Sequence, residues 1–346
     1  MKKSLAAAAS VAALALTLTA CGSGTGSGSS ASPAANNSMS IMVGGLDKQI
    51  YLPFMLAQKL GYYTAAGLTV ELSDEPAGVN AETAMLAGQV DAVGGFYDHT
   101  IDLQAKGQAT EAVVSMLQVP GEVELCRADL KGTVHTAADF KGRNLGVTDL
   151  GSSTDFLTQY LAQKNGVTPA DTTRIGVQAG PTFIAAMDHK SIDCGMTTEP
   201  TVSNLLNSGK AYVIDDMRTA QGTRDALGGV YPATSLYMRT DYVNANKDKV
   251  QKLVSAYVKT LKWIQGHSAA EIAAQMPPDY YAGIGKAAYT AALDSEKGIY
   301  NPTGLMPTDG PATCVAVLQA NADIKGRQIE LTKTYTNEFA QAAQTQ

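Results

Sequence analysis

Short apolar runs alternate with segments of helical spacing along the chain after residue 39. The runs at residues 41–43 and 90–93 precede helical patterns at 51–60 and 99–105, and the alternation resumes at Leu145. Apolar runs without in-and-out alternation are typical of parallel strands that are covered by helices on both faces. The pattern therefore predicts an α/β fold.

The second half of this pattern repeats the first. LAQKLG at residues 56–61 recurs as LAQKNG at 161–166, and the AM…VDA pattern of residues 84–92 recurs as AM…IDC at 186–194. The two matches keep the same order, so they indicate two lobes with the same winding. Ligands of open parallel sheets bind beyond the carboxyl ends of the strands. If those edges face each other, their loops form the two walls of one cleft.

The pattern becomes helical after residue 210. Residues 246–264 carry apolar side chains at three-four spacing with lysines on the opposite face, which predicts a long helix with a buried stripe. Pro277 and residues 300–304 separate further helices, the last at about 329–343. We expect this helical C-terminal tail to pack on the first lobe.

The first 20 residues have the features of a secretory signal. Two lysines precede an apolar run at residues 5–18, which is too short to span a membrane, and a small residue precedes Cys21. Either Cys21 is acylated as the first residue of a mature lipoprotein, or cleavage leaves it as an ordinary thiol. Residues 21–39 are rich in Gly, Ser and Ala, a composition that predicts a flexible linker.

Composition limits the possible functions. The chain of 346 residues is long enough for two lobes, and 32 acidic against 26 basic side chains give no electrostatic support for nucleic-acid binding. Besides Cys21, the cysteines are Cys126, Cys194 and Cys314. They allow one disulfide and one thiol or three thiols, and the spacing does not select a pairing. Neither a metal site nor a cofactor is predicted.

Several motifs occur in an order that resembles a known family. They are LGYY at residues 60–63, GLTVE at 67–71, AGQVDA at 87–92, DFKGRNLGV at 139–147, GSST at 151–154 and TEP at 198–200. Together they resemble extracytoplasmic solute-binding lipoproteins of ABC importers, in the group that binds nitrate, sulfonates, taurine and thiamine-precursor pyrimidines. The resemblance extends from residue 41 to about 265.

This resemblance implies a type II periplasmic-binding fold with two doubly wound α/β lobes and a ligand cleft between them. Two crossover segments would join the lobes, near residues 122–127 and 231–237. We expect the first lobe to comprise residues 40–122 and 236–346, and the second lobe to comprise residues 123–235.

Residues 151–155, GSSTD, form a loop that enters a predicted helix. Unpaired N–H groups and the helix dipole favour an anion or a carbonyl group at such a place, and Ser152, Ser153 and Thr154 add hydroxyl donors. A serine nucleophile would need a nearby base, and the spacing of the four histidines places none beside it. The alternative role for Ser153 or Thr154 is capping of the helix.

Aromatic and acidic side chains complete the predicted walls of the cleft. Phe96 and Tyr97 follow a Gly-Gly turn at a strand end, where a ring stacks on a ligand or packs in the core. The predicted ligand-binding residues are Leu46, Asp47, Tyr51, Phe96, Tyr97, Ser152, Ser153, Thr154, Glu199 and Tyr231.

These features predict a solute-binding component of an ABC importer and not an enzyme. The resemblance favours a sulfonate or taurine-like solute. Because Asp47, Asp98 and Glu199 outnumber Lys48 on the predicted walls, the acids favour an aminopyrimidine or another amine-bearing solute. Two alternatives have less support. A pyrimidine-synthase-like enzyme would need a cysteine-rich motif, which this chain lacks, and a receptor-coupled sensor has the same sequence features as a transport protein.

The resemblance also predicts the setting of the protein. We expect an exported, extracytoplasmic monomer that is lipid-anchored to the membrane through Cys21. Its partners would be a small-molecule solute and an ABC permease.

Overall fold

The computed structural model describes residues 37–345 of the chain. The predicted signal at residues 1–20, Cys21 and most of the predicted linker at 21–39 lie outside the described residues. Among residues 37–345, no helix is long and apolar enough to cross a membrane.

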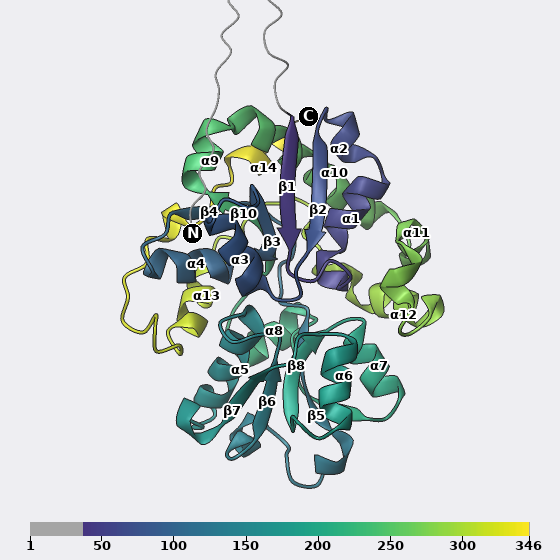
Figure 1. Cartoon of the computed structure of the whole chain (residues 1–346), viewed down its shortest axis with the longest axis vertical. Helices are drawn as coiled ribbons and strands as arrows, with labels where there is room; N and C mark the ends of the chain where they lie inside the picture. The colour runs from purple at the N-terminus through teal and green to yellow at the C-terminus, as the bar shows by residue number, and fades with distance from the viewer. Residues whose placement is uncertain (1–36, 346) are drawn as a thin grey trace, which may run out of the picture. The chain divides into compact units, whose positions relative to one another are not determined.

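Two five-stranded mixed sheets form the centres of two lobes, which lie one above the other in Figure 1. In spatial order, the first sheet consists of β2 (Thr69–Asp74), β1 (Ser38–Val43), β3 (Ala92–Phe96), β10 (Thr234–Arg239) and β4 (Thr110–Ser115). The second consists of β7 (Thr173–Gly176), β6 (Asn144–Val147), β8 (Cys194–Thr198), β5 (Glu122–Arg127) and β9 (Ala211–Asp216). The structure thus confirms the predicted α/β fold with two lobes.

Helices cover both sheets. The helices of the first lobe are α1 (Leu52–Lys59), α2 (Tyr62–Ala65), α3 (Gly78–Leu86), α4 (Asp98–Ala105), α9 (Thr240–Ala245), α10 (Lys247–Gly266), α11 (Ala269–Gln275), α12 (Lys286–Glu296), α13 (Gly310–Leu318) and α14 (Glu338–Gln344). Those of the second lobe are α5 (Ser153–Lys164), α6 (Pro181–Asp188), α7 (Thr201–Asn207) and α8 (Ala220–Leu227).

The two lobes repeat the same topology, as the sequence repeat predicts. β1 in the first sheet and β6 in the second are parallel to both of their neighbours, whereas β10 and β5, which enter from the other lobe, are antiparallel to theirs. The repeated aspartates have the same role, because Asp91 Oδ2 accepts the Ser40 N–H at 2.8 Å and Asp193 Oδ2 accepts the Asn144 N–H at 2.9 Å. Asp91 therefore anchors β1, and Asp193 anchors the first residue of β6.

The chain crosses between the lobes at residues 116–121 and 228–233, just before β5 and β10. Most of the residues predicted to form the crossovers, 122–127 and 231–237, belong to these two strands instead. They join the sheets because their backbone groups pair on both sides. The exact lobe boundaries remain our proposal.

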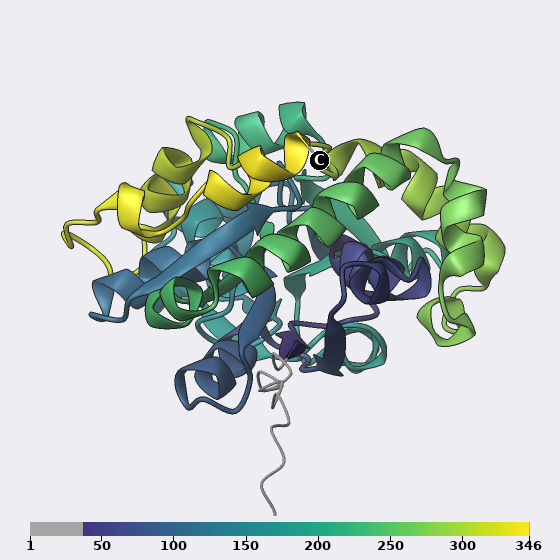
Figure 2. The same ribbon diagram turned by 90° about the horizontal axis from the view of Figure 1, so that it is seen from above.

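The long helix predicted at residues 246–264 is confirmed as α10, whose buried stripe includes Leu253, Tyr257 and Leu261. α14 packs beside it, as seen from above in Figure 2. The last helix begins later than predicted, at Glu338, because the preceding Tyr335 bridges to Ala112 of β4. The segment before α14 therefore pairs with a sheet edge instead of forming a helix.

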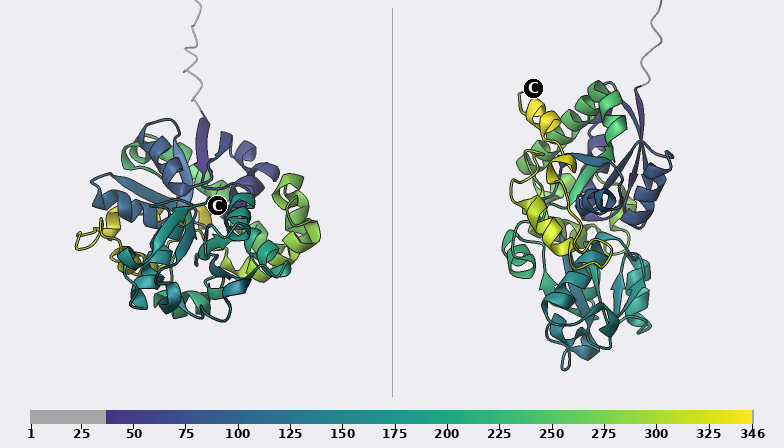
Figure 3. Two further views of the ribbon diagram at one scale, coloured as in Figure 1. Left: turned by 60° about the horizontal axis from the view of Figure 1, so that its bottom comes forward. Right: turned by 90° about the vertical axis from the view of Figure 1, so that its left-hand side faces the viewer.

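The C-terminal part also reaches the second lobe. α13 contacts both α4 and α5, and the right-hand view of Figure 3 shows the yellow C-terminal segment running down the side of the first lobe. The Gln163 side chain of α5 donates to the Ala320 carbonyl at 2.7 Å. The C-terminal tail thus packs on the first lobe, as predicted, and also holds the second.

The cysteines adopt one of the alternatives that the sequence left open. Cys126 in β5 and Cys194 in β8 form a disulfide between directly paired residues of neighbouring strands. Cys314 in α13 is a buried free thiol. The disulfide lies within the second lobe.

Candidate functional site

A small cavity lies where the carboxyl edges of the two sheets meet, and we call it the inner chamber. Its volume is about 20 Å³, which is room for about one water-sized group. Both lobes contribute to the wall, so separation of the lobes would widen the chamber. The lining residues are Gly44, Lys48, Ile50, Tyr51, Gly78, Phe96, His99, Glu122, Thr148, Ser152, Ser153 and Thr154.

The loop after β1 places a lysine in the chamber wall. Lys48 is only 8% exposed, and its ammonium donates to the carbonyls of Gly44 at 2.8 Å and Pro76 at 3.1 Å. Burial lowers the pKa of Lys48, although the negative charges of Glu122 and Asp47 act in the opposite direction. An ammonium group has three N–H donors, so Lys48 keeps one N–H for a ligand or for Glu122.

His99 is a buried histidine of the chamber wall with the acids Glu82 and Asp98 near it. His99 Nδ1 lies 3.0 Å from Glu82 Oε2, and both side chains are almost fully buried. Burial alone would lower the pKa of His99, but the hydrogen bond and charge of Glu82, with the charges of Asp98 and Asp102, raise it to about 9. The neighbouring acids therefore favour the protonated form of the imidazole, which would add positive charge to the chamber.

The opposite wall is the start of α5, which follows β6. Thr154 Oγ1 accepts the Thr148 N–H at 2.9 Å and so ties the helix start to the strand end. Ser152 Oγ is buried and has no hydrogen-bond partner among the described residues. The first N–H groups of a helix have no intrahelical acceptor, so this end of α5 favours an acceptor group of a solute.

Ser153 joins the two lobes. Its hydroxyl donates to Asp98 Oδ1 at 2.7 Å and lies 3.4 Å from His99 Nε2. The expectation that no histidine lies beside a serine of this loop is therefore wrong, because lobe packing, not sequence spacing, brings His99 there. The single hydroxyl proton of Ser153 is donated to Asp98 and not to His99, so this arrangement is a hydrogen-bonded bridge between lobes and not an activated nucleophile.

The strand that enters the second lobe carries two buried acids on one face. Glu122 Oε2 has no hydrogen-bond partner among the described residues, and burial raises the pKa of this carboxyl while Lys48 opposes the shift. Glu124 accepts the Thr158 hydroxyl at 2.9 Å, and burial raises its pKa to about 8. Glu122 therefore faces the chamber as a carboxyl with free hydrogen-bonding capacity.

A larger cavity of about 420 Å³ lies at the mouth of the cleft, and we call it the outer pocket. It shares Lys48 with the inner chamber. Its first-lobe wall includes Asp47 and Asp74, its second-lobe wall includes residues 178–182, and the loop between α11 and α12 closes one side with Tyr280. The two cavities therefore meet at one side chain.

The structure distributes the ten predicted site residues over four places. Tyr51, Phe96, Ser152, Ser153 and Thr154 line the inner chamber, and Asp47 lines the outer pocket. The Tyr231 hydroxyl donates to Asp98 Oδ2 at 2.6 Å behind the chamber. The remaining three predicted residues line neither cavity, and they are Leu46, Tyr97 and Glu199.

These three residues have structural partners. The Leu46 N–H donates to Asp74 Oδ1 at 2.6 Å, and the buried Tyr97 hydroxyl bonds Thr334 while its ring contacts Tyr335. Both contacts link distant parts of the first lobe.

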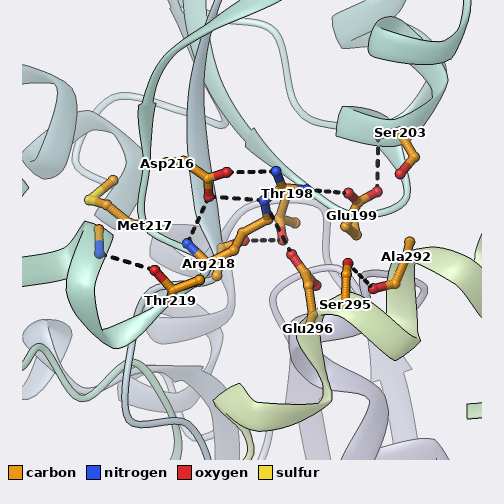
Figure 4. Close-up of polar contacts among 12 residues, drawn as sticks. Thr198, Glu199, Ser203, Asp216, Met217, Arg218, Thr219, Ala292, Ser295 and Glu296 are labelled. Carbon is orange, nitrogen blue, oxygen red and sulfur yellow. Dashed lines mark hydrogen bonds and ion pairs between the residues drawn. The ribbon is translucent and has the colours of Figure 1, made fainter.

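Glu199 is fully buried in a polar cluster that Figure 4 shows. Its Oε1 accepts from Arg218 Nη1 at 2.9 Å, and Asp216 and Glu296 lie around the same guanidinium. We predicted Glu199 as a ligand contact because it follows a strand end, but the structure places an arginine against it. A buried carboxylate needs such a partner.

Lys48, His99 and Glu122 are chamber residues that were not among the predicted site residues. The sequence indicates Lys48 only as a cation of the loop, and His99 is the second residue of α4. A signal for Glu122 was present, because the acids at residues 122 and 124 interrupt an otherwise apolar strand on one face. No group of His, Cys, Asp and Glu suited to a metal ion occurs among the described residues.

Comparisons with known proteins agree with this geometry. A solved structure of a Bordetella bronchiseptica RB50 protein is 35% identical, with a TM-score of 0.85 over 89% of this chain and 97% of that one. The alkanesulfonate-binding protein SsuA from Xanthomonas axonopodis pv. citri, solved bound to MOPS, is 18% identical, with a TM-score of 0.68 over 87% of this chain and 98% of that one. The second comparison supports the fold alone.

YtlA of Bacillus subtilis (strain 168), by its description a candidate binding protein, is 21% identical over 64% of this chain. The chain spans 65% of the length of that curated relative. A family model described as NMT1/THI5 like matches residues 49–270, the region in which we quoted most of the motifs. Because this match covers well over half of the sequence, the chain belongs to the NMT1/THI5-like family.

Proposed function

We propose that the protein is the solute-binding component of an ABC importer and not an enzyme. It captures a small polar organic solute by closure of its two lobes and delivers the solute to a membrane permease. The observation that carries this proposal is a chamber walled by both lobes, in which Ser152 Oγ and Glu122 Oε2 are buried without partners among the described residues. Buried polar groups without partners are costly, and a bound solute would satisfy them.

The chamber is polar on both sides. Lys48, protonated His99 and the start of α5 favour the acceptor end of a solute, whereas Glu122 favours an amine. A taurine-like zwitterion has both ends, and it agrees with the alkanesulfonate-binding name of one structural neighbour. Because the chamber as described holds about one water-sized group, such a solute enters only when the lobes part.

A second candidate solute is an aminopyrimidine. Because the pKa of Glu122 is raised by burial, its carboxyl can carry a proton and present one donor and one acceptor side by side. That pair matches the ring nitrogen and amino group of an aminopyrimidine. The rings of Tyr51 and Phe96 line the same chamber and offer apolar contact to a flat solute.

The cellular setting is part of the same proposal. Export by the N-terminal signal, acylation of Cys21 and an extracytoplasmic position would hold the protein near its permease. We propose that it acts there as a monomer. The dipeptide LT before Ala20 and Cys21, together with the Gly- and Ser-rich stretch after it, supports this setting.

The proposal is tested by binding and compaction. Thermal shift and small-angle scattering with sulfonates, taurine, nitrate, amino acids and aminopyrimidines should identify a solute that raises Tm and compacts the protein. Glu122→Gln then separates the two candidates. Binding of an ammonium group weakens about tenfold because it needs the carboxylate, whereas an aminopyrimidine is retained because an amide also pairs a donor with an acceptor.

The matched control is Glu111→Gln, in β4 and outside both cavities, which should leave binding unchanged. If none of these solute classes raises Tm or compacts the wild-type protein, capture by lobe closure is the wrong function.

A further inference from the structure

The outer pocket has the size of a binding site, whereas the inner chamber does not. Its volume of about 420 Å³ falls in the range of sites that enclose small organic molecules, while the inner chamber holds about one water-sized group. Lys48 belongs to both walls, so a molecule in the outer pocket lies next to the chamber entrance. A solute with a small polar tip would therefore leave its body in the outer pocket.

The charges around the outer pocket are mostly negative. Asp47, Asp74 and Asp279 are lining residues, and Lys48 is the one cation among the lining side chains, all of which the structure describes. The Lys48 ammonium already donates to two carbonyls on the first-lobe wall. Three carboxylates against one engaged ammonium favour a cationic group over an anionic one.

A buried hydroxyl provides a second and independent indication of a ligand. Tyr280 lines the pocket and is 8% exposed, and its hydroxyl has no hydrogen-bond partner among the described residues. Burial is the main cause that raises the pKa of Tyr280, and the charges of Asp47 and Asp74 contribute to the shift. The hydroxyl is thus buried near carboxylates that do not bond it, as expected for a group completed by a ligand.

The remaining wall is largely apolar. Pro181 and Ile184 of α6 line the pocket, and so do Ala282 and Ile284 of the loop before α12. Apolar walls with acids at the rim match an ammonium group attached to a short carbon chain. They match a fully hydrated inorganic cation poorly, because such an ion gains nothing from apolar contact.

We propose that the outer pocket is a second subsite of the cleft, which binds a further alkylammonium arm of the solute near Asp47, Asp279 and Tyr280, separate from the group that faces Glu122 in the inner chamber. This inference rests on the proposed function, because it assigns the solute a cationic arm that extends from the inner chamber. It also predicts that the subsite binds a simple alkylammonium ion by itself.

The experiment titrates the full chain with n-butylammonium and, in parallel, with n-butanol as the neutral analogue of the same length, at fixed ionic strength. Chemical-shift changes report binding. We expect butylammonium to bind several-fold more tightly than butanol. Asp47→Asn and Asp279→Asn should each weaken butylammonium binding about threefold, because both acids lie at an exposed rim. Tyr280→Phe should weaken it about fivefold through the lost hydroxyl.

Two matched controls lie on the neighbouring helix α12. Asp294→Asn removes an acid outside the pocket, and Tyr289→Phe removes another buried hydroxyl that has no partner among residues 37–345 and does not line the pocket. Neither control should change binding of butylammonium. The subsite is refuted if butylammonium and butanol bind equally, or if the controls weaken butylammonium as much as the pocket variants do.

The two proposals fail in different ways. If butylammonium binds as described but no solute compacts the protein, the subsite stands and capture by lobe closure does not. If a solute without a cationic arm compacts the protein and butylammonium does not bind, the function stands and the subsite is refuted.

Discussion

The two lobes share one winding but carry different chemistry at equivalent positions. β10 of the first lobe and β5 of the second occupy the same place in their sheets. Leu236 pairs with Gly94 of β3, and Glu124 pairs with Met196, the equivalent residue of β8. Where β10 has Leu236, β5 has the buried acid Glu124. The repeated scaffold therefore sets where a side chain lies, and the local residue sets its chemistry.

The residues that line the inner chamber also differ in chemistry between the two lobes. The first lobe contributes the basic side chains Lys48 and His99 to the inner chamber, whereas the second lobe contributes Glu122 and the hydroxyls at the start of α5. Ser153 and Asp98 join these two sets by one hydrogen bond at 2.7 Å. Basic side chains on one wall, with an acid and hydroxyls on the other, let the lobes close without placing like charges against each other.

The largest expected difference between the lobes concerns the disulfide. Cys126→Ala with Cys194→Ala removes a cross-link between residues 68 apart in sequence. We expect the free energy of unfolding of the second lobe to fall by about 4 kcal/mol, because the unfolded chain regains loop entropy. Denaturant unfolding under oxidising conditions measures the loss.

The matched variant in the first lobe is Cys314→Ala, which removes a buried thiol without a cross-link and should cost about 1 kcal/mol. Equal losses for the two variants would show that the disulfide contributes no more to stability than an ordinary buried side chain.

The sequence predicted the repeated scaffold but not the residues that face each other across it. The match between residues 84–92 and 186–194 identified two lobes because each stretch is one continuous run of residues that forms the end of a helix and the start of the next strand. The three-four spacing of residues 246–264 likewise identified α10. Both signals are local in sequence, so they are readable without coordinates.

The contacts of the site are not local. His99 and Ser153 lie in different lobes, and Glu199 after β8 lies against Arg218 after β9, two strands away in the sheet. Spacing alone cannot show whether a strand-end acid faces a ligand or an arginine. The pairing of Cys126 with Cys194 was undetermined for the same reason, since it depends on the register of β5 and β8.

Of the equivalent residues Glu124 and Leu236, only Glu124 can ionise, so the second lobe should respond to pH at this position. The pKa of Glu124 is raised to about 8 from an ordinary value of 4.5, so the folded state keeps a proton that the unfolded state releases. The contribution of Glu124 to stability is therefore greatest below about pH 4.5 and falls as the pH rises to about 8, by at most about 1.4 kcal/mol per pH unit. Urea unfolding at several pH values measures this slope.

Glu124→Gln should reduce this decline, because the amide keeps the hydrogen bonding of the neutral acid and does not ionise. The exposed Glu338→Gln in α14 serves as the control and should leave the slope unchanged. A Glu124→Gln protein with the wild-type slope would show that Glu124 ionises normally and that this difference between the lobes has no energetic consequence.

The smallest expected effects come from neighbouring serines that differ only in their partners. Ser153→Ala removes the bridge to Asp98, a hydrogen bond to a carboxylate, and should disfavour closure by about 2 kcal/mol, which scattering detects as a more open protein without solute.

Ser152→Ala removes a hydroxyl that has no partner among the described residues, so stability and shape should not change. Its effect should appear only with solute, as an affinity about fivefold lower because one hydrogen bond to the solute is lost. If Ser152→Ala opens the empty protein as much as Ser153→Ala does, or leaves affinity unchanged, the start of α5 is a structural helix end and not a wall that contacts the solute.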